Sequence, residues 1–327
     1  MKTIVILRNR PSKTMYYAID LYAQIWKSNG YEVIDHIGLN SIPPADAIIL
    51  HVDKTILPSD YALLHERYPI VINGKVSDIS RRRFSQLKLS STDNYKGPAI
   101  VKTNANYGGW PEHILHRRNA WKKKIQQHLL QQPPRSNFAL NNLESQHDRN
   151  KSFLRQFASA GTHSLMSVFQ SLRQINQADR WQTTSTLNPR RYPIFEKFED
   201  IPPGVWKNDH LIVERFISDY QDGLFHTNYY CFFGDKEISG RLGAPNPIVK
   251  FSNCETDSFE PTPNPVRQWR KSLGLDFGRL DYVQQDGEYF LIDANKTEGG
   301  GSNNKAYMHE MEFLASGLDA FLDDPPS

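Results

Sequence analysis

The sequence predicts a small N-terminal α/β domain with a parallel sheet, followed by a larger α+β part. Two observations predict this order. Short apolar strands alternate with helical segments over residues 1–90, which is typical of βαβ units. Beyond residue 90 the strands come in pairs joined by tight turns, and the clearest pair lies in residues 277–301 (FGRLDYVQQDGEYFLIDANKTEGGG).

The composition narrows the class of protein. The 327 residues are enough for two or three packed units, and 39% hydrophobic with 23% charged residues is ordinary for a soluble globular protein. A net charge of +3 argues against a nucleic-acid partner, and no apolar run is long enough to span a membrane. Thr3–Leu7 is followed by Arg8, which predicts a strand and not a signal peptide. Cys231 and Cys254 are too few for a disulfide framework. We expect a cytoplasmic protein.

The first 90 residues supply the predicted parallel sheet. Helical spacing indicates a helix that ends at Asn29-Gly30, with its apolar positions at Ala18, Leu21, Tyr22, Ile25 and Trp26. Apolar runs predict the strands Thr3–Leu7, Tyr31–Ile37, Ala45–Val52 and Pro69–Asn73. Such a sheet offers a crevice at the carboxyl ends of its strands. Arg8, Asn9 and Arg10 follow the first strand, so they either line this crevice or lie in solvent.

A glycine-containing loop follows the next predicted strand, Ala99–Lys102. Gly108 and Gly109 let backbone N–H groups approach a phosphate closely, with the charge of Lys102 nearby. A plain turn explains the same residues. The GxxxxGK[ST] pattern of a Walker loop is absent.

Residues 113–190 read as a polar insertion. Their first part is basic and rich in glutamine and is broken by Pro133-Pro134, which is typical of a solvated helix and a loop. Apolar spacing predicts an amphipathic helix from Leu165 to Leu172.

The remaining elements are a strand, a hairpin and two helices. His210–Ile217 predicts a buried strand. Thr227–Phe233 and Lys236–Leu242 predict a hairpin that continues the sheet of that strand. Helices are expected at Val266–Leu273 and Met308–Leu322.

The hairpin within residues 277–301 has two possible registers. A two-residue loop at Asp286-Gly287 places Asp281 and Asp293 on opposite faces. A three-residue loop pairs Asp281 with Leu291 and Arg279 with Asp293. In the second register the polar residues Arg279, Asp281, Asp293 and Asn295 share one face, and the other face carries Leu280, Tyr282, Phe290, Ile292 and Ala294. We expect this register, because it puts every apolar side chain of the pair on the core side except Val283, Tyr289 and Leu291.

Two carboxylates, an amide oxygen and a guanidinium on one face suit a magnesium ion and a phosphate group. A solvated polar face with an Arg279–Asp293 ion pair is the alternative.

The stretch GRLDYV…DG…FLIDANKT resembles the last nucleotide-binding motif of the ATP-grasp superfamily. The resemblance covers residues 91–310 and implies a two-lobed ATP-grasp domain at 91–327, preceded by the α/β domain at 1–90. It implies Asp281, Asp293 and Asn295 as ligands of Mg²⁺ (or Mn²⁺), and Arg279 as the catalytic residue facing the transferred phosphate or the oxyanion. The family usually has Glu in place of Asp293.

The resemblance extends to the other nucleotide contacts. It implies that Lys102, Gly108 and Gly109 bind the ATP phosphates. If the Thr227–Leu242 hairpin continues the sheet of the His210–Ile217 strand, Arg241 and Lys250 face the polyphosphate; the alternative is that they lie on the outer face of the sheet. It assigns adenine to Glu214, Arg215 and Phe216, and ribose to Asp219 or, less well by spacing, to Asp222. In the family a cation upstream of the glycine loop also helps to hold the nucleotide, and four residues are open for this role: Arg81, Arg82, Arg83 and Lys88.

The activity implied by the resemblance is an ATP- and magnesium-dependent ligase. Such an enzyme activates a carboxylate as an acyl phosphate and joins it to an amine, with small molecules or peptides as substrates. The alternatives are an ATP-grasp kinase or phosphotransferase and a non-catalytic nucleotide-binding protein.

Overall fold

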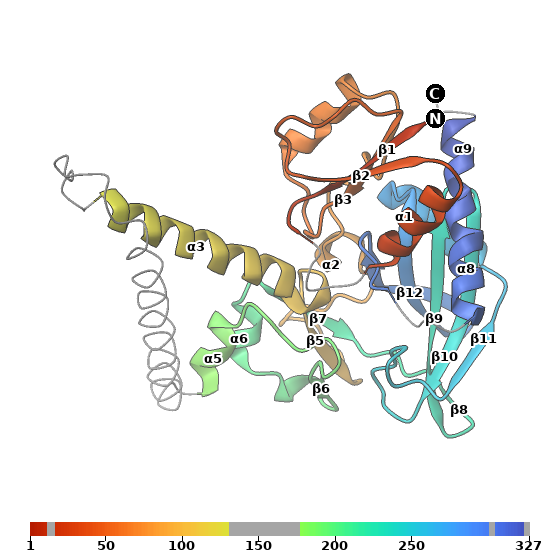
Figure 1. Ribbon diagram of the computed structural model, residues 1–327. Helices are drawn as coiled ribbons and strands as arrows, with labels where there is room; N and C mark the ends of the chain where they lie inside the picture. Colours follow the sequence, from red (N-terminus) through yellow and green to blue (C-terminus); the bar gives the residue numbers. More distant parts are fainter. Residues whose placement is uncertain (12–16, 131–176, 301–304, 324–327) are drawn as a thin grey trace, which may run out of the picture.

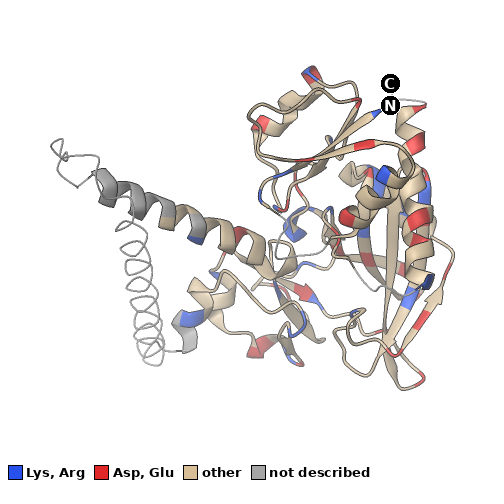
Figure 2. Ribbon diagram, in the orientation of Figure 1, with Lys and Arg blue, Asp and Glu red and all other residues tan. Residues whose placement is uncertain are grey.

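The computed structural model describes residues 1–11, 17–130, 177–300 and 305–323 (Figure 1). The helix predicted from Leu165 to Leu172 lies outside these residues. Within them, no helix is both long and apolar enough to cross a membrane. Basic and acidic residues are interspersed along the described ribbon (Figure 2).

A parallel sheet forms the N-terminal part, as predicted. Its order is β2-β1-β3-β4, and its strands are β1 (Thr3–Arg8), β2 (Glu32–Ile37), β3 (Ala47–His51) and β4 (Val71–Ile72). Ile4 and Ile6 of β1 point to the face covered by α1 (Ala18–Ser28), and Val5 and Leu7 point to the face covered by η1 (Ser59–Glu66). Because both faces are covered, the central strands are apolar up to their last residues.

A small lobe follows, with an antiparallel sheet in the order β6-β5-β7. It contains β5 (Ala99–Thr103), β6 (Ile194–Phe195), β7 (Leu211–Arg215), η2 (Tyr107–Gly109), α3 (Trp110–Leu130), α5 (Gln177–Thr183), η3 (Phe198–Asp200) and α6 (Pro203–Trp206). Its core is separate from the others and includes Val101, Val205 and Val213. Helix α3 projects away from the rest of the described chain (Figure 1). The short helix α2 (Arg81–Phe84) precedes this lobe.

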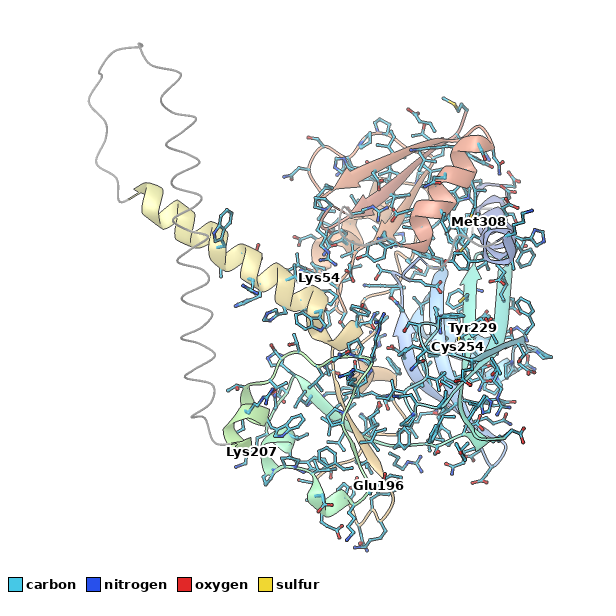
Figure 3. The ribbon with its side chains drawn as sticks, turned by 60° about the horizontal axis from the view of Figure 1, so that its bottom comes forward. Lys54, Glu196, Lys207, Tyr229, Cys254 and Met308 are labelled. Atoms are coloured by element: carbon cyan, nitrogen blue, oxygen red, sulfur yellow. The ribbon has the colours of Figure 1, made fainter. Side chains whose placement is uncertain are left out.

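A large lobe completes the fold around a sheet in the order β11-β10-β9-β12-β13, with β8 paired to β9. Its elements are β8 (Tyr220–Gln221), β9 (Leu224–Phe233), β10 (Lys236–Ala244), β11 (Thr256–Phe259), α7 (Asn264–Leu273), β12 (Phe277–Gln285), β13 (Glu288–Asn295), α8 (Lys305–Ala315), η4 (Ser316–Leu318) and α9 (Asp319–Leu322). Figure 3 shows the two lobes, with Glu196 and Lys207 on the small lobe and Tyr229 and Cys254 on the large one.

The predicted continuity between β7 and the β9–β10 hairpin is wrong. Strand β7 pairs with β5 on one edge. On its other edge, the N–H of Arg215 donates to Leu87 O (2.8 Å) and the N–H of Leu89 donates to Val213 O (2.9 Å). With both edges occupied, β7 cannot pair with β9, so the hairpin joins the large sheet instead.

The N-terminal sheet and the large lobe share one core. Trp26 of α1 packs against Phe233 of β9, and its indole N–H donates to Ala315 O of α8 at 2.8 Å. Asn73 accepts from the N–H groups of Asp276 (2.8 Å) and Phe277 (3.1 Å) through its Oδ1 atom. These two parts therefore form one body, and the small lobe is the separately packed unit.

The β12–β13 hairpin has neither of the predicted registers throughout. Gln285 pairs with Glu288, which makes the turn a two-residue loop at Asp286-Gly287. A β-bulge next to Asp281 then shifts the register by one residue, so that Asp281 pairs with Asp293 and Arg279 pairs with Asn295. The four polar residues share one face as expected, although the three-residue loop is wrong. The bulge also changes the apolar assignment, because Leu291 joins the core and Ile292 lines a cavity.

Candidate functional site

A cavity lies between the two lobes. One part of its wall is apolar and comes from both lobes: Leu87, Ile100, Phe216, Ile217, Phe225, Val249, Val283 and Ile292. The charged part includes Arg81, Lys102, Lys250 and Asp293. The cavity thus combines an apolar slot with a mainly cationic end, a combination that suits an aromatic ring attached to an anionic group.

Lys102 projects into this cavity from β5 and is 7% exposed. Its ammonium group lies 2.8 Å from Glu214 Oε2 of β7 and donates to Ile292 O in the bulge at 3.4 Å. Glu214 is fully buried. Lys102 therefore connects the small lobe with the β12–β13 hairpin of the large lobe.

Arg81 is the one of the four basic residues left open by the sequence that lines this cavity. It is 2% exposed and lines the cavity, and it donates to Thr103 O (3.0 Å), Ala105 O (2.8 Å) and Asp293 Oδ1 (2.7 Å). Burial opposes its charge, but Asp293 together with Tyr192, Glu214 and Asp281 raises the pKa of Arg81 above its ordinary value. The other three basic residues of the segment are exposed or partly exposed, and Arg82 pairs with Asp209 at 3.3 Å. No spacing in the sequence distinguishes Arg81 from its neighbours.

Asp281 and Arg279 lie beside the cavity wall in β12. The guanidinium Nε of Arg279 donates to Asp281 Oδ1 at 2.6 Å, and Lys250 Nζ lies 3.7 Å from Asp281 Oδ2. Burial opposes the carboxylate charge, yet Arg279 and Lys250 hold the pKa of Asp281 below its ordinary value. Arg279 also stacks over the rings of Tyr229 and Phe251, which fixes its orientation.

Asn295 lies at the end of β13, under the loop that precedes α3. Its Oδ1 atom accepts from the N–H of Thr297 (2.9 Å) and from Asn106 Nδ2 (3.3 Å). The N–H of Asn106 in turn donates to Thr55 Oγ1 at 2.8 Å. The loop is thereby held to both the β12–β13 hairpin and the N-terminal part of the chain.

Gly108 and Gly109 pack under a different segment of the chain. Both have positive φ angles, and a Cβ atom on either would overlap a carbonyl oxygen, that of Leu187 or Ser185. Among the described residues, neither glycine belongs to the cavity wall. Close backbone packing thus accounts for both glycines, and their contact with phosphates stays a prediction.

Some of the predicted hinge residues belong to the cavity wall. Arg215, Phe216 and Asp219 line the cavity. The backbone N–H groups of Arg215 and Phe216 are already used, by Leu87 O (2.8 Å) and Pro98 O (2.9 Å). Asp219 accepts from Arg241 at 3.0 Å, and Arg241 itself is not in the cavity wall. The adenine and ribose contacts therefore stay predictions, with Arg241 placed as the partner of Asp219.

Asp281, Asp293 and Asn295 can be tested as a magnesium site by their chemistry. Mg²⁺ is usually held by one or two carboxylates together with water and substrate phosphates. Within the described part of the chain, no group of three or more His, Cys, Asp or Glu residues is arranged to hold a metal ion. Asp281 and Asp293, which lie opposite each other in the hairpin, nevertheless supply the two carboxylates that a magnesium ion needs, provided that a nucleotide supplies further oxygens.

A second buried polar cluster lies at the carboxyl edge of the N-terminal sheet. Arg8 pairs with Asp20 (2.5 Å) and Asp35 (2.6 Å), and Arg10 pairs with Asp53. Lys296 is 2% exposed, and its Nζ atom has no hydrogen-bond partner among the described residues. Burial lowers the pKa of Lys296 to about 8, although three nearby acids act in the opposite direction: Asp53, Asp78 and Glu112. The Asn295–Gly299 turn contacts this edge of the sheet, because Thr297 Oγ1 donates to Asp53 Oδ1 at 3.3 Å.

Several wall residues escaped the sequence analysis. Ile100 lies two residues before Lys102 and Val283 two residues after Asp281, so strand alternation alone places each on the same face as its charged neighbour. Tyr192 and Pro189 come from an irregular segment and follow no period.

Fold and site together define a protein with a parallel α/β domain and two further lobes that enclose a cavity. No protein-family model matches the sequence, and no curated protein matches it. Among solved structures, the chain is similar to a RimK domain protein ATP-grasp from Sphaerobacter thermophilus, with 9% identity over 98% of each chain and a TM-score of 0.43. It is similar to D-alanine–D-alanine ligase from Bacillus anthracis, with 11% identity over 99% of this chain and 98% of that chain and a TM-score of 0.41.

A third similar structure is a RiPP-associated ATP-grasp ligase from Chryseobacterium gregarium in complex with ADP and a leader and core peptide, with 9% identity over 100% of this chain and 98% of that chain and a TM-score of 0.42. The likeness is distant, so the function has to be inferred from the site itself.

Proposed function

We propose that this protein is an ATP-dependent ligase that activates a carboxylate as an acyl phosphate and joins it to an amine. One observation carries the proposal. Arg81 and Asp293, 212 residues apart in sequence, meet beside Lys102 at the charged end of a cavity whose other wall is apolar. An apolar slot with a cationic end suits a purine base followed by a polyphosphate.

The residues of the site have distinct roles in the proposed reaction. The apolar wall, which includes Phe216, holds adenine, and the carboxylate of Asp219 faces the ribose. Lys102, Arg81 and Lys250 neutralise the polyphosphate and stabilise the charge that develops as ADP leaves. The substrate carboxylate attacks the γ-phosphorus atom, which breaks the bond to ADP and forms an acyl phosphate.

The second half-reaction takes place at the carbonyl carbon. An amine attacks the acyl phosphate, inorganic phosphate leaves, and the amine loses a proton. Arg279, held by Asp281 and two aromatic rings, is positioned to stabilise the oxyanion of the tetrahedral intermediate. No side-chain nucleophile is required.

Asp281, Asp293 and Asn295 would hold Mg²⁺, which supplies charge neutralisation for the phosphates when it is bound. Asn295 has to release Asn106 or Thr297 to do so, because its Oδ1 atom already accepts from both. We infer that the substrates are small molecules or peptides, as the sequence resemblance implies.

Nucleotide binding is the first test. Mg²⁺ with a non-hydrolysable ATP analogue should raise the melting temperature of the protein, and Lys102→Met should lower the affinity about tenfold or more by removing one charge-assisted phosphate contact. The matched control is Lys207→Met, because Lys207 is an exposed lysine of the same lobe (Figure 3). Equal affinity in both variants would contradict the assignment of the cavity.

Product analysis tests the reaction class. With ATP and a pool of carboxylates and amines, a ligase releases ADP and free phosphate in equal amounts. A kinase releases ADP while the phosphate appears in an organic product, and a binding protein releases neither.

A further inference from the structure

The carboxylates assigned to the metal are already paired with cations of the same site. Asp293 accepts from Arg81 Nη2 at 2.7 Å, and Asp281 accepts from Arg279 Nε at 2.6 Å. Lys250 lies 3.7 Å from the second oxygen of Asp281. The side chains of Arg81 and Arg279 are 2% and 12% exposed, so solvent does little to weaken these ion pairs.

We propose that Arg81 and Lys250 act as stand-ins for the divalent cation, and that they exchange partners when metal and nucleotide bind together. This inference rests on the proposed function. In the ligand-free protein Arg81 neutralises Asp293, and Lys250 lies beside Asp281 in addition to Arg279. In the complex the metal neutralises the carboxylates, and Arg81 and Lys250 turn to the phosphates.

The exchange follows from the cost of leaving a buried charge without a partner. A metal ion that binds alone has to displace Arg81 from Asp293, and the guanidinium then stays in the cavity without a counterion. A nucleotide that binds alone draws Arg81 away from Asp293 and Lys250 away from Asp281, which leaves Asp293 without its ion-pair partner, directly opposite Asp281 in the hairpin. Neither cost arises when both ligands bind, because every charge then has a partner.

Metal and nucleotide binding are therefore positively coupled. The side chain of Arg81 has opposite effects on the binding of the two ligands. Its removal weakens nucleotide binding but frees Asp293 for the metal. We expect Arg81→Gln to bind a divalent cation without nucleotide about tenfold more tightly than the unmodified protein does, a factor within the usual range of coupling between sites.

The test measures Mn²⁺ affinity by calorimetry or by the electron paramagnetic resonance signal of free Mn²⁺, with and without a non-hydrolysable ATP analogue. Mn²⁺ should bind the unmodified protein about tenfold or more tightly when the analogue is present. In Arg81→Gln the affinity for Mn²⁺ alone should rise and the effect of the analogue should shrink. Arg82→Gln is the control, because Arg82 belongs to the same helix but pairs with exposed Asp209.

Arg81 also binds two backbone carbonyl groups, so its variant can lose stability. Lys250→Met provides an independent test, since the side chain of Lys250 is 32% exposed and its only ion-pair partner among the described residues is Asp281. It should likewise tighten the binding of Mn²⁺ alone. Equal Mn²⁺ affinity with and without the analogue, or no gain in either variant, would overturn the exchange while leaving nucleotide binding intact. Failure of the analogue to bind under all conditions would overturn the proposed function as well.

Discussion

Lys102 and Glu214 form a buried ion pair at the boundary between the two lobes, with side-chain exposures of 9% and 0%. A pair in this position adds little net stability, because burial costs both charges their hydration. Removing only one partner is far more damaging, since it leaves the other charge buried alone. The pair is therefore better explained by the function of Lys102 than by stability.

This view predicts a non-additive effect on stability. Lys102→Met alone should lower the free energy of unfolding by about 3–5 kcal/mol, because Glu214 then stays buried without a counterion. The double variant Lys102→Met, Glu214→Gln should recover a large part of this loss. Urea unfolding followed by circular dichroism measures both values. A double variant less stable than Lys102→Met would contradict the explanation.

Lys296 gives a prediction for the dependence of stability on pH. Its pKa is about 8 in the folded protein against 10.5 as an ordinary lysine, so the unfolded chain binds the proton more tightly. The free energy of unfolding should therefore increase as pH rises from about 8 to 10.5, by at most about 3 kcal/mol from this residue. Below pH 8 the full cost of the buried charge is present.

The measurement compares the protein with Lys296→Met in a buffer that contains a metal chelator. The variant should be more stable at pH 7, and the difference should shrink toward pH 10.5. A difference that does not change with pH would show that Lys296 titrates normally in the folded state.

At the scale of elements, the β12–β13 hairpin shows what the sequence can and cannot specify. Alternation predicts that Arg279, Asp281, Asp293 and Asn295 share a face, and the structure confirms it. The predicted three-residue loop is wrong. The turn has two residues, and the bulge beside Asp281 brings the four polar residues back to one face. Local sequence carries no mark of this bulge. Its position becomes apparent only when the packing of Leu291 and Ile292 is known.

Local patterns predicted most of the regular elements, whereas contacts between distant segments escaped them. The four parallel strands, the β9–β10 hairpin and helix α7 all follow from apolar spacing and turn residues. The isolation of β7 from the large sheet depends on residues 87–89, which occupy its free edge. The sequence could not show that Arg81 belongs to the site either, because its partner Asp293 lies 212 residues away.

The glycines before α3 provide a prediction about an element boundary. Gly108→Ala should lower the free energy of unfolding by clearly more than Gly30→Ala, although both glycines have positive φ angles. At Gly30 there is open space, so only the backbone conformation is penalised, by about 1–2 kcal/mol. At Gly108 the new Cβ atom also overlaps Leu187 O. Thermal unfolding of the two variants would decide, and equal losses would argue against close packing at Gly108.

At the scale of the whole molecule, the described chain has four hydrophobic clusters, one of which belongs to the small lobe. The N-terminal sheet and the large lobe share the cluster around Trp26 and Phe233, whereas the small lobe packs around Val101 and Val205. The cavity lies between these two bodies. Relative movement of the small lobe is therefore the simplest way for a nucleotide to enter and leave.

The shared core predicts which parts lose protection together. Trp26→Ala should cost about 3–5 kcal/mol and should increase hydrogen exchange in β1, β3, β9 and β12 alike. Strands β5 and β7 of the small lobe should keep more of their protection. Mass spectrometry of exchanged peptides measures both effects. Increased exchange limited to the N-terminal sheet would show that the two parts are separate units.

The core that the first 90 residues share with the large lobe also limits where crossover points can be placed in a chimaera. Exchange of the N-terminal part against that of a distant relative would remove Trp26 and Asn73 and leave their partners Phe233, Ala315 and Phe277 without these contacts. The small lobe has a self-contained interior, so a transplant of that lobe disturbs fewer buried contacts. Successful chimaeras should therefore have their crossover points on either side of the small lobe.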